Sequence, residues 1–215
     1  MRVASRALEV RLARRAKRAG VTLSASLAGP LLAYFELLQR WNRRINLTAL
    51  TDEDEAIDRL LLEPVLAATC LPAKTFSLLD VGSGGGSPAI PLKLAAPHAS
   101  LVMVEARSRK AAFLREAVRA LGLERASVET ARLENLALNP EFQSMFSAVS
   151  VRAVRIGVPE LGAFGRVLQP GGCILLFLPS SAVPGEISTS DFTNVAVHPL
   201  LPAGRSFLLK ATFAG

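Results

Sequence analysis

One short stretch of the sequence, 77–91, combines residue types and spacings that can hold a ligand. It carries the pattern D-x-G-x-G-x-G on Asp80, Gly82, Gly84 and Gly86. The apolar run 76–81 before the glycines is typical of a buried parallel strand, and a helical stretch follows them. A turn between a strand and a helix presents backbone N–H groups to a ligand. We therefore expect a binding site at this turn.

The spacing of the glycines distinguishes two ligand classes. A dinucleotide site needs G-x-G-x-x-G, and its third glycine position is occupied here by Ser87. The complete pattern, D-x-G-x-G-x-G, resembles the cofactor loop of S-adenosylmethionine-dependent methyltransferases. That cofactor carries an ammonium and a sulfonium and no phosphate, so an anionic Asp80 suits it. Glu105 ends the next predicted strand, where an acid can accept hydrogen bonds from both ribose hydroxyls.

Composition excludes several other classes of function. The 215 residues include only two cysteines and two histidines, all far apart, so we expect no metal site and no disulfide framework. Cysteine scarcity favours a reducing compartment, and we expect a cytoplasmic protein. No apolar run is long enough to span a membrane, and the basic N-terminus lacks the apolar core of a secretory signal.

The positive charge lies almost entirely at the N-terminus. Residues 1–50 hold ten Arg and Lys against two acids, whereas the rest of the chain holds fifteen against sixteen. Such a surplus favours a polyanionic partner, and arginine suits phosphates and base edges. A solvated basic arm without a partner is the alternative.

The elements around the loop alternate between strands and helices. We predict basic and apolar-faced helices at 5–19 and 27–45, and a helix capped by Thr51 or Asp52 that runs to Leu66. Tyr34 and Trp41 on the second helix are expected in the core rather than stacked on bases. Further strands are predicted at 100–105, 126–131, 146–151 and 173–178 and helices at 108–121 and 159–168, with Gln169-Pro170-Gly171-Gly172 as a turn before the last of these strands. The runs 192–198 and 205–213 are too close together for a parallel crossover and are expected to form a hairpin. The fold class is thus α/β, a doubly wound, mostly parallel Rossmann-like sheet with an antiparallel C-terminal hairpin, plus N-terminal helices.

Longer segments resemble one family, the ribosomal RNA small subunit methyltransferases G (RsmG, or GidB). The matching segments are Y-F-E-L-L-Q-R-W-N-R-R-I-N-L-T-A at 34–49, D-V-G-S-G-G-G-S-P-A-I-P at 80–91, E-A-R-S-R-K-A-A-F-L-R-E at 105–116, A-R-L-E-N-L at 131–136, R-A-V at 152–154 and L-P-A-G-R-S-F-L-L-K at 201–210. W-N-x-x-I-N-L-T is the most family-specific of these. The resemblance implies a class I methyltransferase domain at 71–215, preceded by a basic, RNA-docking helical extension at 1–70.

The resemblance also implies the reaction: methyl transfer from S-adenosylmethionine to N7 of a guanine in small-subunit (16S) ribosomal RNA. Guanine N7 bears no proton, so no general base is expected. The motif for amino-group methylation and a cysteine after strand 146–151 for pyrimidine-carbon methylation are both absent. The implied partner is the RNA or the small ribosomal subunit, and we expect a monomer.

Carried over residue by residue, the family's cofactor contacts fall on Gly82, Ser87, Leu133, Glu134 and Arg152. Asp80, Gly84, Gly86 and Glu105 join them from the reasoning above. Arg152 is the candidate catalytic residue, which would position the guanine edge or the methionine carboxylate, with an ion pair as the alternative. Candidate RNA-binding residues are Arg40, Arg43, Arg44, Arg109, Lys110 and Arg205.

The chain departs from the family's pattern at Glu55, Ser87, Ala89 and Ser147. Two other functions stay open from the sequence: a methyltransferase acting on another RNA or a small molecule, and a non-catalytic RNA-binding module. The presence of Asp80, the glycines and Glu105 weighs against the second.

Overall fold

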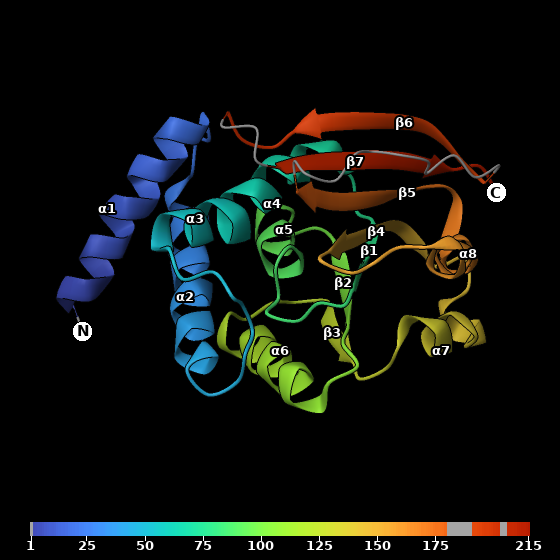
Figure 1. The fold of residues 1–215 in the computed structure, drawn as a ribbon, viewed down its shortest axis with the longest axis horizontal. Helices are drawn as coiled ribbons and strands as arrows, with labels where there is room; N and C mark the ends of the chain where they lie inside the picture. Colours follow the sequence, from blue (N-terminus) through green and yellow to red (C-terminus); the bar gives the residue numbers. More distant parts are fainter. Residues whose placement is uncertain (1, 180–190, 203–205) are drawn as a thin grey trace.

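A seven-stranded sheet forms the centre of the structure (Figure 1). The computed structural model describes residues 2–179, 191–202 and 206–215. The strands are β1 (Ser77–Val81), β2 (Ser100–Val104), β3 (Ala126–Glu129), β4 (Phe146–Arg152), β5 (Leu168–Pro179), β6 (Phe192–Pro199) and β7 (Ser206–Phe213), in the order β3-β2-β1-β4-β5-β7-β6. Strands β1 to β5 pair in parallel, whereas β7 is antiparallel to both β5 and β6. The predicted fold class and its C-terminal hairpin are confirmed.

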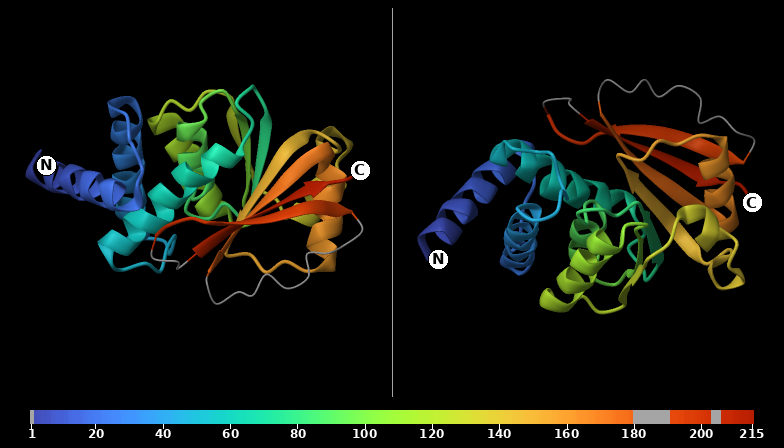
Figure 2. Two further views of the ribbon diagram at one scale, coloured as in Figure 1. Left: turned by 90° about the horizontal axis from the view of Figure 1, so that it is seen from above. Right: turned by 60° about the horizontal axis from the view of Figure 1, so that its bottom comes forward.

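Helices cover both faces of the sheet, as a parallel sheet requires. They are α1 (Arg2–Ala19), α2 (Ala25–Asn42), α3 (Glu53–Ile57), α4 (Glu63–Ala67), α5 (Ala89–Ala95), α6 (Ser108–Ala120), α7 (Leu133–Ala137) and α8 (Val158–Val167), with the π-helical turn η1 (Asp58–Leu62) and the 3₁₀ turns η2 (Ala68–Cys70) and η3 (Pro140–Phe142). Successive residues of β1 point to opposite faces, so Leu78 and Leu79 belong to different apolar clusters. The N-terminal helices, α5 and α6 pack on the face of Leu78, and α7 and α8 pack on the face of Leu79 (Figure 2).

Several predicted boundaries differ from the structure by a few residues, and three of the differences have a clear local reason. The second helix begins at Ala25 and ends at Asn42 rather than running to residue 45, because the Asn42 side chain binds the backbone of the following segment. The third helix starts after Asp52, whose carboxylate accepts from the Glu55 N–H at 2.7 Å, and it continues through η1 to η2. The predicted turn 169–172 lies inside β5 as an irregularity, since Leu168 already pairs with Phe146.

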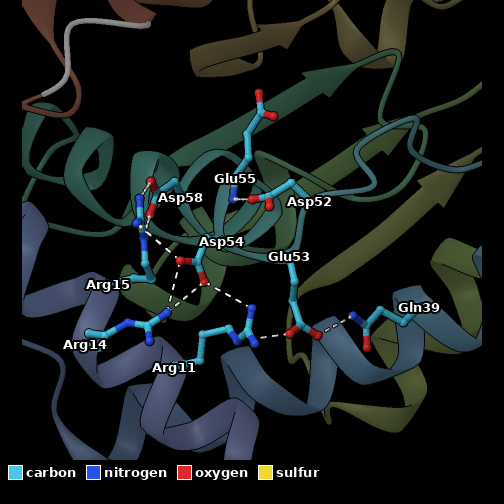
Figure 3. Close-up of polar contacts among 9 residues, drawn as sticks. All are labelled: Arg11, Arg14, Arg15, Gln39, Asp52, Glu53, Asp54, Glu55 and Asp58. Atoms are coloured by element: carbon cyan, nitrogen blue, oxygen red, sulfur yellow. Dashed lines mark hydrogen bonds and ion pairs between the residues drawn. The ribbon is translucent and has the colours of Figure 1, made fainter.

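The first helix is held to α3 and η1 by ion pairs (Figure 3). Arg11 lies 3.1 Å from Glu53 and 3.3 Å from Asp54, and Arg14 lies 3.0 Å from Asp54. A further pair joins Arg15 to Asp58. Part of the N-terminal positive charge is therefore balanced within the protein, which a count of charges by segment did not predict.

Candidate active site

The glycine loop lies where the order of the sheet reverses. Strand β1 pairs with β2 on one side and with β4 on the other, and the loop that follows β1 lies beside the end of β4. The switch point at the carboxyl edge of a doubly wound sheet is where ligands bind in such folds.

The backbone of the loop needs glycine at the three positions of the motif. Gly82, Gly84 and Gly86 have φ values of +69°, +50° and +86°, which residues with a Cβ rarely adopt. A Cβ on Gly82 would lie 2.6 Å from Val154 Cγ2, and one on Gly86 would lie 2.6 Å from Ile90 Cδ1. Conformation therefore favours glycine at all three positions, and close packing adds to this at Gly82 and Gly86.

Asp80 lies beneath the loop and is almost fully buried. Its Oδ1 accepts a hydrogen bond from the Ser150 hydroxyl at 2.5 Å, across the β1–β4 pair. Burial raises the pKa of this carboxyl to about 6, although the bond from Ser150 acts in the opposite direction. Its other oxygen is buried and has no hydrogen-bond partner in the part of the chain that the structure describes. Such an anion favours positive charge at the loop.

Glu105 fastens the loop from the end of β2. One carboxylate oxygen accepts from the Gly84 N–H at 2.9 Å, and the other accepts from the Arg107 N–H at 2.8 Å. Each oxygen keeps a second lone pair. The carboxylate can therefore hold the loop and still accept from hydroxyl groups, so the ribose contact stays a prediction.

A cavity of about 320 Å³ opens above the glycine loop. It is lined by Leu38, Leu47, Thr48, Ala49, Leu50, Arg59, Leu60, Gly82, Ser83, Gly84, Gly85, Ser87, Lys110, Arg152 and Ala153. This volume is at the lower end of the range for small-molecule sites. Its polar groups are backbone amides, hydroxyls and three cations, so it suits a ligand that carries a carboxylate.

Arg152, at the end of β4, is fixed on several sides. Its Nη2 donates to Glu63 Oε2 at 2.8 Å, its Nη1 donates to the Arg59 carbonyl, and its guanidinium carbon lies 4.5 Å from the centre of the Phe177 ring. Ser206 donates to the other oxygen of Glu63. Burial lowers the pKa of Arg152 and raises that of Glu63, while their mutual attraction opposes both shifts. Arginine's intrinsic pKa is so high that the side chain stays charged, and the two form a buried ion pair.

Comparison with known proteins identifies the family. The model of the GidB family, described as rRNA small subunit methyltransferase G, matches residues 29–211. The ribosomal RNA small subunit methyltransferase G of Stenotrophomonas maltophilia is 42% identical over 159 residues, which cover 73% of this chain and 71% of that protein. The enzyme of the same name from Xanthomonas euvesicatoria is 35% identical over 186 residues, covering 85% and 84%. This chain belongs to the rRNA small subunit methyltransferase G family.

Solved structures agree on the fold. A SAM-dependent methyltransferase from Aquifex aeolicus superposes with a TM-score of 0.58 at 15% identity, covering 76% of this chain and 94% of that one. At such low identity the likeness concerns the fold alone, and it confirms the class I methyltransferase architecture predicted from the sequence.

The remaining residues carried over from the methyltransferase G family lie at the edges of the cavity or outside it. Ser87 lines it, and the Ser87 hydroxyl donates to the Leu60 carbonyl at 3.0 Å. Leu133 is buried in the apolar cluster under α7 and α8, whereas Glu134 is exposed at the start of α7. Neither lines the cavity. The structure therefore places the family's predicted contacts along one edge of the sheet without bringing them all into one cavity.

The candidate RNA contacts fall into two groups. Arg40, Arg43 and Arg44 are exposed around a surface groove at the end of α2, together with Leu37, Trp41 and Glu116. Arg109 is exposed at the start of α6, whereas Lys110 points to the cavity near Gly84. Arg205 lies outside the described residues.

Tyr34 and Trp41 of α2 pack in the core, as predicted. Tyr34 is fully buried, and its hydroxyl donates to the Gly85 carbonyl at 2.6 Å. Trp41 is half-buried edge-on against Phe113, with ring centres 5.8 Å apart. The contact from Tyr34 to the glycine loop is one that spacing alone did not predict.

Several residues of the cavity were missed by the sequence reasoning. Arg59 and the segment 47–50 carry no chemical signature of their own, and neither does Glu63, which lies outside the cavity as the partner of Arg152. A signal was present for the segment, since W-N-x-x-I-N-L-T is the part of the chain most specific to the methyltransferase G family. Within the described residues, no cluster of three potential metal ligands occurs, and no helix is long and apolar enough to cross a membrane.

The family departures have local partners. Glu55 forms an ion pair with Arg59 at 3.5 Å, Ala89 is buried, and the Ser147 hydroxyl lies 3.3 Å from that of Ser77. All of these contacts are internal, so they show how the substitutions are accommodated in the fold.

Proposed function

We propose that this protein transfers a methyl group from S-adenosylmethionine to N7 of a guanine in small-subunit ribosomal RNA. The observation that carries the chemistry is the lining of the cavity. None of its described residues is a His, Asp, Glu or Cys. Guanine N7 has a free lone pair and bears no proton, so a reaction there needs no proton acceptor. The bound cofactor supplies an electrophilic methyl group on a sulfonium.

The residues above β1 and β2 fit this cofactor. Gly82, Gly84 and Gly85 present backbone rather than side chains to the cavity, and buried Asp80 favours the cationic groups of the cofactor. Glu105 has free lone pairs for the ribose hydroxyls. Arg152 and Lys110 line the cavity, where they would bind the methionine carboxylate. Ser87, Leu133 and Glu134 complete the cofactor contacts.

Catalysis then rests on alignment. The chain's own residues bind the two reactants, exclude water and hold N7 in line with the methyl group at about 3–3.5 Å. Rigid support is consistent with this role, because Arg152 is held by Glu63 and Phe177 and the loop is held by Glu105 and Tyr34.

The RNA would dock along the end of α2 and the start of α6. Arg40, Arg43, Arg44 and Arg109 are exposed and form no ion pair with any described residue. Phosphates can therefore bind them without displacing an internal partner. We assign residues 1–70 to this docking part and 71–215 to the methyltransferase domain, and we place the protein in the cytoplasm as a monomer. Arg205 would add an RNA contact.

The test is methyl transfer from labelled S-adenosylmethionine to small ribosomal subunits that lack the family's modification, followed by mass analysis of the nucleosides. We expect 7-methylguanosine. Cofactor binding without transfer would mean that the acceptor is another RNA or a small molecule. RNA binding without cofactor binding would point to a non-catalytic module.

A further inference from the structure

The segment 47–50 forms the wall of the cavity that faces the glycine loop. All four of its residues line the cavity. The contact with the loop is close, since a Cβ on Gly85 would lie 3.1 Å from the Leu47 carbonyl oxygen and 3.2 Å from Leu38 Cδ1. The segment has no helix or strand of its own to fix it. Its position therefore depends on individual hydrogen bonds, together with the packing of Leu47 in the apolar core.

One side chain supplies most of those bonds. Asn42 Oδ1 accepts from the Leu47 N–H at 2.8 Å and from the Thr48 N–H at 3.0 Å, and Asn42 Nδ2 donates to the Thr48 carbonyl at 3.1 Å. The Thr48 hydroxyl in turn accepts from the Leu50 N–H at 3.2 Å. A single amide thus satisfies two donors and one acceptor of the segment's backbone, and it sets the direction in which the chain leaves α2.

Asn42 belongs to the same helix end as the exposed arginines. Arg40 precedes it by two residues, Arg43 follows it directly, and neighbouring Trp41 packs on Phe113 of α6. The end of α2 is therefore fixed on α6, while Arg40 and Arg43 are exposed. RNA bound by these arginines lies next to the wall that Asn42 supports.

The cavity itself corresponds to the reacting end of the cofactor site. Glu105, which is expected at the ribose of the adenosyl group, does not line it, whereas the glycine loop and Arg152 do. The methyl group is attached at the methionine end of the cofactor. An acceptor base that enters this cavity must therefore lie between the loop and the opposite wall, 47–50.

We propose that Asn42 is a positioning residue for the acceptor guanine, because it holds 47–50 as the wall against which the base is aligned. This inference rests on the proposed function. It also assigns a role to the residues of W-N-x-x-I-N-L-T. Trp41 packs the end of α2 on α6, Asn42 holds the segment 47–50, and Leu47 and Thr48 line the cavity.

The test compares Asn42→Ala and Asn42→Asp with wild type. Asp keeps the two accepted bonds and loses the donor to the Thr48 carbonyl, so it should recover part of the activity. Gln39→Ala is the matched control, because Gln39 lies on the same helix and its amide bonds Glu53 at 3.2 Å rather than the segment. The measurements are kcat and KM for undermethylated small subunits, the Kd for S-adenosylmethionine by calorimetry, and thermal unfolding.

For Asn42→Ala we expect kcat to fall about 10- to 100-fold, as misalignment by roughly an ångström predicts. The KM for the subunit and the cofactor Kd should stay within about 3-fold of wild type, and Gln39→Ala should keep wild-type kcat. An unchanged kcat, or a loss that appears in cofactor affinity instead, would overturn the inference. Wild-type protein that produces no 7-methylguanosine would instead overturn the proposed function.

Discussion

The buried pair between Arg152 and Glu63 offers the sharpest test of how the site is held. The carboxylate of Glu63 is 1% exposed and receives bonds from Arg152 and Ser206. Replacing Glu63 with Leu removes the only acid that the structure pairs with Arg152 among the described residues and leaves the guanidinium buried. An uncompensated buried charge costs about 3–5 kcal/mol. For a domain of this size, that predicts a fall in Tm of about 6–20 °C.

The reverse change, Arg152→Met, leaves the Glu63 carboxylate buried without its cationic partner. It should lower the free energy of unfolding by a similar amount. In the double variant neither charge remains. The residual cost comes from the Arg59 carbonyl, which loses its donor, and from the buried Ser206 hydroxyl, which loses its acceptor at about 1–3 kcal/mol. We therefore expect the double variant to be more stable than either single variant.

Urea unfolding followed by circular dichroism at pH 7.5 measures all four proteins, provided that the m-values agree. The reasoning would be refuted if the loss of unfolding free energy in the double variant equalled the sum of the losses in the two single variants. Such additivity is expected for independent sites and not for a coupled pair. The double variant should still lack methyl transfer, because Arg152 also lines the cavity.

Three further results are expected. Gly86→Ala should weaken S-adenosylmethionine binding at least about 10-fold by calorimetry, because Gly86 has a φ of +86° and its Cβ would contact Ile90. The control is Gly122→Ala, which has a φ of +59° but open space around it and should bind the cofactor like wild type. Equal losses of cofactor affinity in the two variants would contradict this reasoning. Burial raises the pKa of Asp80 from 3.8 to about 6, so the folded protein retains a proton that the unfolded chain releases, and this group lowers stability as pH rises through that window. Asp80→Asn removes the effect, so its stability relative to wild type should rise by up to about 3 kcal/mol between pH 4 and pH 7 in urea titrations, and a constant difference would be evidence against the shift. Arg43→Glu with Arg44→Glu should weaken RNA binding and reduce the slope of log K against log salt by about 0.7–0.9 for each phosphate that the variant no longer binds, whereas an unchanged slope would exclude the end of α2 as the docking surface.

Local patterns predicted the elements around the site well. The strand, glycine turn and helix at 77–95 have short-range signals, and the six residues between the last two predicted strands leave only a hairpin. Asp52 was one of two predicted caps, and its hydrogen bond to the Glu55 N–H decides between them. Signals of this kind act within a few residues, so the sequence shows them directly.

Contacts between distant segments were not predictable in the same way. Glu63 and Arg152 are 89 residues apart, and Tyr34 and Gly85 are 51 apart. The count of N-terminal charge did not predict the ion pairs of Arg11, Arg14 and Arg15 for the same reason. Their acidic partners lie just beyond residue 50, on α3 and η1, which pack against α1. Pairing depends on the packing of α1 on α3, which no local pattern encodes.

The walls of the cavity come from two different parts of the chain. The glycine loop, Lys110 and Arg152 come from the sheet and α6, whereas Leu38, the segment 47–50 and Arg59 come from the N-terminal helices and the chain between them. The first apolar cluster likewise includes both Leu31 of α2 and Leu78 of β1. The glycine loop thus acquires its opposite wall from the N-terminal part of the chain that contains W-N-x-x-I-N-L-T. If the exposed arginines of α2 bind the RNA as proposed, the same helix end that supports one wall of the cavity also takes part in RNA docking.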